Sequence, residues 1–234
     1  MTSDHILAEV CLESAADAMA AEAGGADRVE LCSDLAAGGL TPEVDTVHDV
    51  LAATRLPVVA MVRCRGGDFR YTSDEHAEMG KQAQTLLALG VSGIVYGGVD
   101  AEGMPQIESL RRMRAAANTA SRGRAELIFH RAFDSLRDPF AALEMLIDCG
   151  VDRVLTSGHP DGVDAGLETL RRLTEAADGR ITVMPGGGIR EHNLAAVLAA
   201  TGAQEVHFSA RPDPAAVTEA GAVAGFVGIL RAAR

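Results

Sequence analysis

The chain has 234 residues, of which 47% are hydrophobic and 3% aromatic, and it contains no tryptophan. Its formal net charge of −12, with no run of basic residues, argues against nucleic acid as a partner. No stretch approaches the ~18 apolar residues of a membrane span, and residues 1–12 lack the features of a signal peptide. We therefore expect a cytoplasmic protein with reduced cysteines and no membrane partner.

Short apolar runs alternate with longer amphipathic segments along the whole chain. In chain order, the runs predict strands over 6–12, 27–31, 57–63, 91–96, 126–130, 153–156, 181–184 and 205–208. The segments that follow them predict helices over 14–23, 42–54, 73–89, 105–117, 139–149, 164–177, 190–200 and 214–233. Thr41 is the expected N-cap of the second helix, with Pro42 in its first turn.

This strict alternation predicts a parallel sheet with right-handed crossovers. Eight such units close naturally into a (β/α)₈ barrel of the TIM type, and we expect one such domain over residues 1–234. An open doubly wound sheet is the alternative. It usually needs a glycine-rich turn after the first strand, where this chain has Glu13-Ser14-Ala15.

Five charged or titratable residues fall inside or at the end of predicted strands. They are Glu9, Glu30, Arg63, His130 and His207. Burying such groups is costly unless they are paired, so one interpretation is a layer of ion pairs that fills the barrel interior. Functional groups of a barrel gather at the C-terminal ends of its strands, so we favour a shared polar pocket there.

The run Gly186-Gly187-Gly188 stands between the seventh strand and the seventh helix. Glycines let backbone N–H groups approach an anion at a helix N-terminus, and barrels often bind phosphate after strands seven and eight. Ser209 and Arg211 follow the eighth strand. The run predicts an anion site, or else a tight turn that only requires positive φ.

Cys11 and Cys32 end neighbouring strands, which lie ~4.8 Å apart in a sheet. Two facing sulfurs there could hold one soft ion, Cu(I) or Zn²⁺. The alternative is a pair of small buried apolar side chains. Cys64 lies between two arginines, which should favour its thiolate.

Several strand-end segments together resemble the CutC family of copper homeostasis proteins, from Glu9 to Ala210. The segments are DRVELC at 27–32, GGLTP at 38–42, RGGDF at 65–69, FHRAFD at 129–134, RVLTSG at 153–158 and EVH at 205–207. The resemblance implies a (β/α)₈ barrel, a cytoplasmic location, a role in copper tolerance and Cu(I) binding by Cys11 and Cys32. Cys64 stands where the family has proline, so no metal role transfers to it.

Two functions are compatible with these residues. The first is copper homeostasis, with Cu(I) bound by Cys11 and Cys32 and His130 or His207 nearby. The second is an enzyme, an isomerase, lyase or hydrolase that acts on a small anionic or phosphorylated metabolite at the C-terminal mouth. Its catalytic candidates are Glu9, Glu30, His130, Asp134 and His207. Its substrate-binding candidates are Arg63, Arg65, Asp68, Arg131, Thr156, Ser157, Gly186, Gly187, Gly188 and Ser209.

Other chemistries are less compatible with the sequence. Lys81, the only lysine, lies in a predicted helix rather than at a strand end, which argues against a Schiff base. We expect no nucleotide cofactor, because no flavin or nicotinamide motif is present. The alanine-rich outer helices permit close subunit packing and favour a homo-oligomer.

Overall fold

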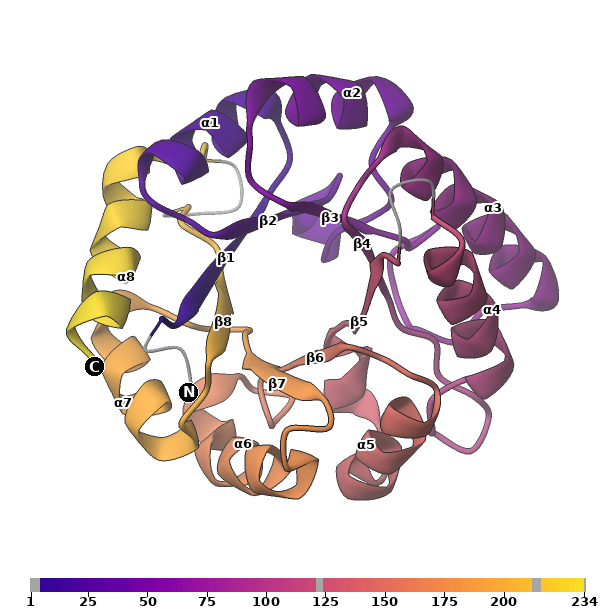
Figure 1. Cartoon of the computed structure of the whole chain (residues 1–234). Helices are drawn as coiled ribbons and strands as arrows, with labels where there is room; N and C mark the ends of the chain where they lie inside the picture. Colours follow the sequence, from indigo (N-terminus) through magenta and orange to yellow (C-terminus); the bar gives the residue numbers. More distant parts are fainter. Residues whose placement is uncertain (1–4, 121–123, 212–215, 234) are drawn as a thin grey trace.

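A computed structural model describes residues 5–120, 124–211 and 216–233, in which eight strands and eight α-helices alternate around a ring (Figure 1). The strands are β1 (Leu7–Leu12), β2 (Arg28–Leu31), β3 (Val58–Met61), β4 (Gly93–Tyr96), β5 (Glu126–Phe129), β6 (Arg153–Thr156), β7 (Thr182–Pro185) and β8 (Glu205–Phe208). The helices are α1 (Ala15–Ala23), α2 (Val44–Ala53), α3 (Ser73–Leu89), α4 (Ile107–Asn118), α5 (Pro139–Asp148), α6 (Val163–Ala177), α7 (Glu191–Thr201) and α8 (Ala220–Ala232). Two short 3₁₀ turns, η1 (Leu35–Ala37) and η2 (Arg131–Ser135), follow β2 and β5.

The strands form one parallel sheet in the order β7-β6-β5-β4-β3-β2-β1-β8. The two end strands meet, because Gly186 after β7 lies against His207 on β8: a Cβ at position 186 would stand 3.1 Å from the Cβ of His207. The ring of strands is therefore nearly closed, with the helices outside it (Figure 1). The predicted (β/α)₈ barrel is confirmed.

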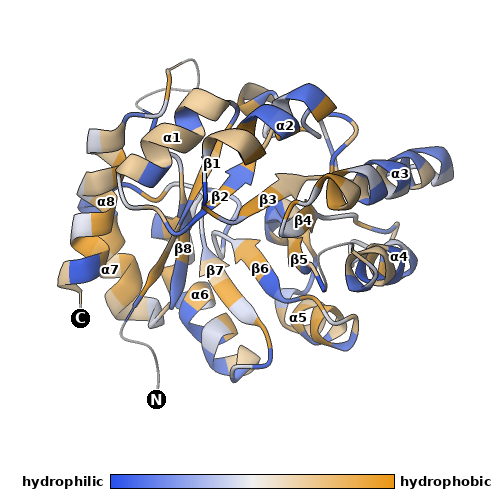
Figure 2. Ribbon diagram, turned by 45° about the horizontal axis from the view of Figure 1, so that its top comes forward, coloured by the Kyte–Doolittle hydropathy of each residue, from blue (hydrophilic) through white to orange (hydrophobic). Residues whose placement is uncertain are grey.

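Successive side chains of each strand point to opposite faces of the sheet, and this alternation produces two separate apolar cores. One face of the strands packs against the helices, with Val10, Leu31 and Phe129 fully buried there. The other face points into the barrel, where Met61, Ile128, Met184 and their neighbours form a second, smaller cluster. In Figure 2, hydrophobic residues are concentrated on β3, β6 and β7, whereas the outer helices α3 and α4 carry many hydrophilic residues.

Most element ends lie within two residues of their predicted positions, but one predicted N-cap and one helix start were wrong. Helix α2 begins at Val44 with Glu43 as its N-cap. Thr41, the predicted cap, instead accepts from the backbone N–H of Arg63 at 2.9 Å and donates to its carbonyl at 3.1 Å. Helix α8 begins at Ala220. Its predicted first residue, Pro214, lies outside the described residues.

A network of ion pairs fills the barrel interior at the N-terminal ends of the strands, which is called the floor below. Arg28 on β2 is 3% exposed, and its guanidinium binds Glu9 and, at 2.7 Å, Glu205. Arg153 binds the same Glu205 at 2.6 Å and Glu126 at 2.7 Å. The floor is therefore closed by paired charges, as the ion-pair interpretation of the strand residues anticipated for Glu9.

Replacing Arg28 with alanine should lower the free energy of unfolding by about 3–5 kcal/mol, because Glu9 and Glu205 would lose their buried partner. Urea denaturation of the two proteins measures the difference. The matched control is Arg171→Ala, which removes exposed pairs with Glu168 and Glu175. Equal effects of the two substitutions would contradict a structural role for the floor network.

Candidate functional site

A cavity of about 400 Å³ opens at the C-terminal ends of the strands. It is called the mouth cavity below, and the residues that line it are Cys11, Glu30, Cys32, Leu35, Ala37, Gly38, Met61, Arg63, Phe69, His130, Arg131, Leu155 and His207. Four of the five charged strand residues singled out above therefore share one cavity. The fifth, Glu9, does not line it and lies on the floor side.

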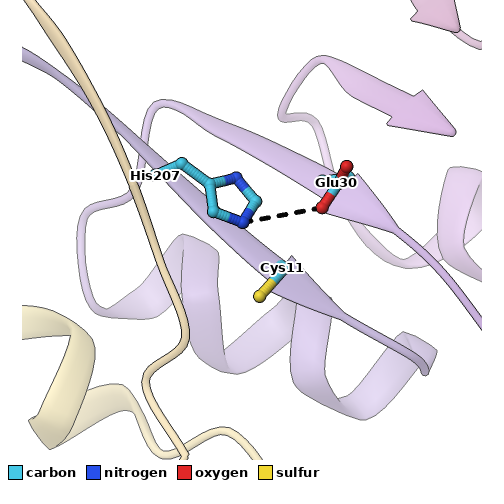
Figure 3. Close-up of side chains that lie close together, drawn as sticks. All are labelled: Cys11, Glu30 and His207. Carbon is cyan, nitrogen blue, oxygen red and sulfur yellow. Dashed lines mark ion pairs between the residues drawn. The ribbon is translucent and has the colours of Figure 1, made fainter. Parts of the chain in front are cut away.

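Three neighbouring strands bring a thiol, a carboxylate and an imidazole together on one wall. One ligand atom each from Cys11 on β1, Glu30 on β2 and His207 on β8 lie within 4.8 Å of one another, and all three residues are buried. The register explains this, since Cys11 pairs with Glu30 across β1 and β2, and β8 is the other neighbour of β1. Figure 3 shows the three side chains converging; they are called the metal-capable group below.

His207 is held between two carboxylates. Its Nδ1 lies 2.8 Å from Glu9 Oε1, and its Nε2 lies 3.6 Å from Glu30 Oε2 (Figure 3). Burial disfavours the imidazolium, but Glu30, Cys11 and Glu9 outweigh it and hold the pKa of His207 well above its usual value. The imidazole is thus oriented by Glu9, with Nε2 presented to the metal-capable group.

The pKa values of the two carboxyl groups beside His207 are shifted in opposite directions. Burial works against the Glu9 carboxylate, yet Arg28 and His207 lower its pKa to about 2. Burial raises the pKa of Glu30, whose Oε1 has no hydrogen-bond partner among the described residues. Glu9 is therefore a fixed anion that positions its neighbours, whereas Glu30 is the carboxyl group able to exchange a proton at the cavity.

Cys32 follows the end of β2 and is fully buried. It lines the mouth cavity with Cys11, but Glu30 rather than Cys32 stands directly across the ladder from Cys11. Burial, followed by the nearby Glu30 carboxylate, raises the pKa of the Cys32 thiol well above its usual value. The sulfur packs on Gly39, where a Cβ would stand 3.1 Å from it.

The opposite wall carries Arg63 and His130. Arg63 donates to three backbone carbonyls, those of Ala37, Gly39 and Gly67, at 2.8–3.3 Å. His130 Nδ1 accepts from the Ala132 N–H at 3.0 Å. Burial, reinforced by the Arg63 charge, lowers the pKa of His130 to about 3, so the ring is neutral at physiological pH.

Asp134 holds Arg131 at the rim of the mouth cavity. It accepts from Arg131 Nε at 2.9 Å, from Ser157 Oγ at 2.7 Å, and from the Thr156 hydroxyl. The Arg131 guanidinium also lies against Gly187, where a Cβ would stand 2.5 Å from its Cζ. The glycine is thus required both by this close approach and by its φ of +86°.

The remaining predicted site residues lie around this cavity rather than in it. Arg65 and Asp68 pair with each other, and Arg65 also pairs with Glu75, all outside the lining. A neighbouring cavity of about 470 Å³ includes Gly187, Gly188 and Ser209 in its lining, whereas Gly186 packs on Leu155 and His207. Arg211 lines this second cavity but is bound by Glu13 and Asp17.

Two residues of the barrel interior, Arg28 and Phe69, were not predicted as functional. Arg28 alternates with Glu30 along β2, so the same period that selected Glu30 could have found it. Phe69, which lines the cavity beside Arg63 and His130, lies in the loop between β3 and α3, where no strand period could have indicated it. The expectation for Cys64 was wrong, because burial and then Glu75 raise the pKa of its thiol despite the adjacent Arg65.

The neutral His130 should make stability fall on acidification. Its folded-state pKa of about 3 lies below the usual 6.5, so its contribution is present above pH 6.5 and is lost as the pH falls toward 3. His130→Asn keeps an acceptor for the Ala132 N–H and should remove this part of the acid sensitivity, on the order of a few kcal/mol. Urea unfolding as a function of pH measures it.

The matched control is His159→Asn. His159 is exposed and accepts from the Asp161 N–H through Nδ1 in the same way. This variant should follow the wild-type stability curve over the same pH range. A wild-type curve for His130→Asn as well would show that the buried imidazole is not the source of the acid sensitivity.

The chain is similar in sequence and in structure to known proteins. A sequence model described as the CutC family matches residues 6–212. The human copper homeostasis protein cutC homolog is 43% identical over 209 residues, covering 89% of this chain and 75% of that protein. A CutC family protein of Bacteroides thetaiotaomicron is 42% identical over 206 residues, covering 87% of this chain and 80% of that protein.

A crystal structure of CutC from Streptococcus agalactiae superposes with a TM-score of 0.80 at 27% identity, covering 87% of this chain and 98% of that one. Within the described residues, every helix is too short or too polar to cross a membrane. The family match spans β1 to β8 and includes both walls of the mouth cavity. The chain belongs to the CutC family.

Proposed function

We propose that this chain binds Cu(I) at the metal-capable group and serves copper homeostasis in the cytoplasm. The observation that carries the proposal is the meeting of Cys11, Glu30 and His207 within 4.8 Å at the mouth of the barrel. The names of the human and other relatives point to copper as the cargo. The four cysteines are free thiols, as a reducing compartment requires.

The donor set fits a soft, thiophilic ion. A thiolate is the preferred ligand of Cu(I), and an imidazole nitrogen also suits copper. A histidine that binds a metal commonly donates its other ring N–H to a carboxylate, which is what Nδ1 of His207 does toward Glu9. Glu30, with an unpaired oxygen, is placed to take the proton that His207 must release.

Cys32 supplies the second thiol in this proposal. It lines the same cavity as Cys11 and lies beside Glu30, although it does not belong to the metal-capable group. Two thiolates bind Cu(I) better than one, so a change in the Cys32 side chain toward Cys11 would complete the site. Metal binding would also favour the thiolate that burial disfavours in the free protein.

The enzyme alternative is not favoured. Arg65, Asp68 and Arg211 are engaged in ion pairs, which leaves the predicted anion-binding set incomplete. The named relatives point to copper rather than to a metabolite. Homo-oligomerisation through the alanine-rich helices stays a prediction.

Anaerobic titration with Cu(I) against a competing chelator tests the proposal. Cys11→Ala and the double variant Cys11→Ala/Cys32→Ala should bind Cu(I) about a hundredfold or more weakly, since even loss of an outer-shell partner costs ten- to hundredfold. Affinity should also fall as the pH is lowered, because protons compete with the metal for thiolate and imidazole.

Cys149→Ala provides the matched control, because this buried thiol at the end of α5 lies outside the metal-capable group. It should bind as the wild type does. If the double variant bound Cu(I) with wild-type affinity, the proposed thiolate site would be contradicted. Preference for Zn²⁺ over Cu(I) would keep a metal site but overturn the copper assignment.

A further inference from the structure

The wall of the mouth cavity opposite the metal-capable group holds two buried donors that nothing satisfies. Arg63 Nε and His130 Nε2 have no hydrogen-bond partner among the described residues. Nδ1 of His130 accepts from the Ala132 backbone, so the neutral ring carries its proton on Nε2, which is a donor. Each residue is only 4% exposed, and unpaired buried donors are rare because they are costly.

The positive charge of Arg63 is also uncompensated. Its guanidinium contacts three backbone carbonyls and the face of Phe69, 4.8 Å from the ring centroid, but no carboxylate in the described part of the chain. By contrast, the buried Arg28 and the half-buried Arg153 are each held by at least two glutamates. Tyr71 approaches Arg63, but neither the Tyr71 hydroxyl nor Arg63 Nε has a hydrogen-bond partner of regular geometry among the described residues, and Tyr71 does not line the cavity.

Both donor-bearing side chains contact the same aromatic ring, and the Arg63 charge acts on His130. Phe69 packs against both, with its ring centroid 5.0 Å from that of His130. The Nδ1 edge of His130 faces Gly97, where a Cβ would stand 2.4 Å from Nδ1 and Cε1. One acceptor group entering the cavity beside Phe69 could therefore reach Arg63 and His130 together.

The remaining walls indicate what accompanies this acceptor. The cavity volume of about 400 Å³ falls in the range of small-molecule sites and exceeds what one metal ion fills. Leu35, Met61 and Leu155 give it an apolar lining between the two polar walls. A single unpaired cation beside a neutral imidazole matches a monoanion better than a phosphate dianion.

We propose that the mouth cavity binds a small organic carboxylate with an apolar body, whose oxygens accept from Arg63 Nε and His130 Nε2. Arg131, held by Asp134 at the rim, stands where such a ligand enters. The apolar body extends past Met61 toward Cys11 and His207, which line the same cavity. This site does not depend on copper, and it adds an organic ligand to the metal proposed above.

Isothermal titration of the reduced, copper-free protein with acetate, isovalerate and benzoate tests the proposal, with isovaleramide and inorganic phosphate as comparison ligands. Isovalerate should bind at least about tenfold more tightly than its amide or phosphate, because hydrogen bonds to a charged acceptor are the stronger ones. The ¹⁵N resonance of His130 Nε2 should shift on binding, which places the ligand at that atom.

Two variants locate the site. His130→Asn and Arg63→Lys each remove one of the unpaired donors and should weaken isovalerate binding about tenfold or more. His159→Asn is the matched control and should bind as the wild type does. Circular dichroism confirms that each variant is folded, and His130→Asn keeps the test decisive if Arg63→Lys is not.

Three results would overturn the proposal: no carboxylate binds, the amide or phosphate binds as tightly as isovalerate, or binding survives in both donor variants. Copper titration of the same preparations separates this outcome from that of the metal site. Loss of Cu(I) binding in the Cys11 variants with unchanged isovalerate affinity supports both sites.

Discussion

The structure depends on one line of charges that runs through the barrel from its closed floor to its open mouth. Arg28 fixes Glu9, Glu9 binds Nδ1 of His207, and Nε2 of His207 faces Glu30. Each residue points inward because it occupies an alternate position on β1, β2 or β8. The Arg28–Glu9 ion pair thus compensates buried charge on the floor of the barrel. Through Glu9 it also orients the His207 imidazole at the mouth.

The two walls of the mouth cavity differ in how their polar groups are satisfied. On the wall of β8, β1 and β2, His207 lies between the carboxylates of Glu9 and Glu30, and one oxygen of Glu30 lacks a hydrogen-bond partner among the described residues. On the wall of β3 and β5, Arg63 has no counter-ion and the neutral His130 has an unpaired Nε2, as far as the described part of the chain shows. The first wall is therefore the basis for the proposed soft cation and the second wall the basis for the proposed carboxylate.

The fold was predictable from the sequence because its signals are local. Apolar runs at regular spacing gave all eight strands, and β6, β8 and α3 have the predicted bounds. The convergence of Glu30, Arg63, His130 and His207 followed from barrel topology alone, since strand ends must meet. What the sequence did not reveal was pairing: that Arg65 and Arg211 would be occupied by Glu75, Glu13 and Asp17 depends on loop conformation.

The register between β1 and β2 explains why Cys11 and Cys32 do not stand directly across from each other, as their positions in the sequence suggested. Equal positions at the ends of β1 and β2 suggested that Cys11 and Cys32 face each other, but β2 is displaced so that Glu30 stands across from Cys11. A shift of two residues keeps a side chain on the same face while moving it along the strand by about 6.6 Å. Cys32 therefore stays in the cavity but lies nearer the mouth than Cys11. Burial, and after it the nearby Glu30 carboxylate, raises the pKa of Cys32 and favours the protonated thiol. In the metal site proposed above, the Cys32 thiol would have to release its proton to bind, as any cysteine ligand must, and the adjacent Glu30 adds to the cost of that release.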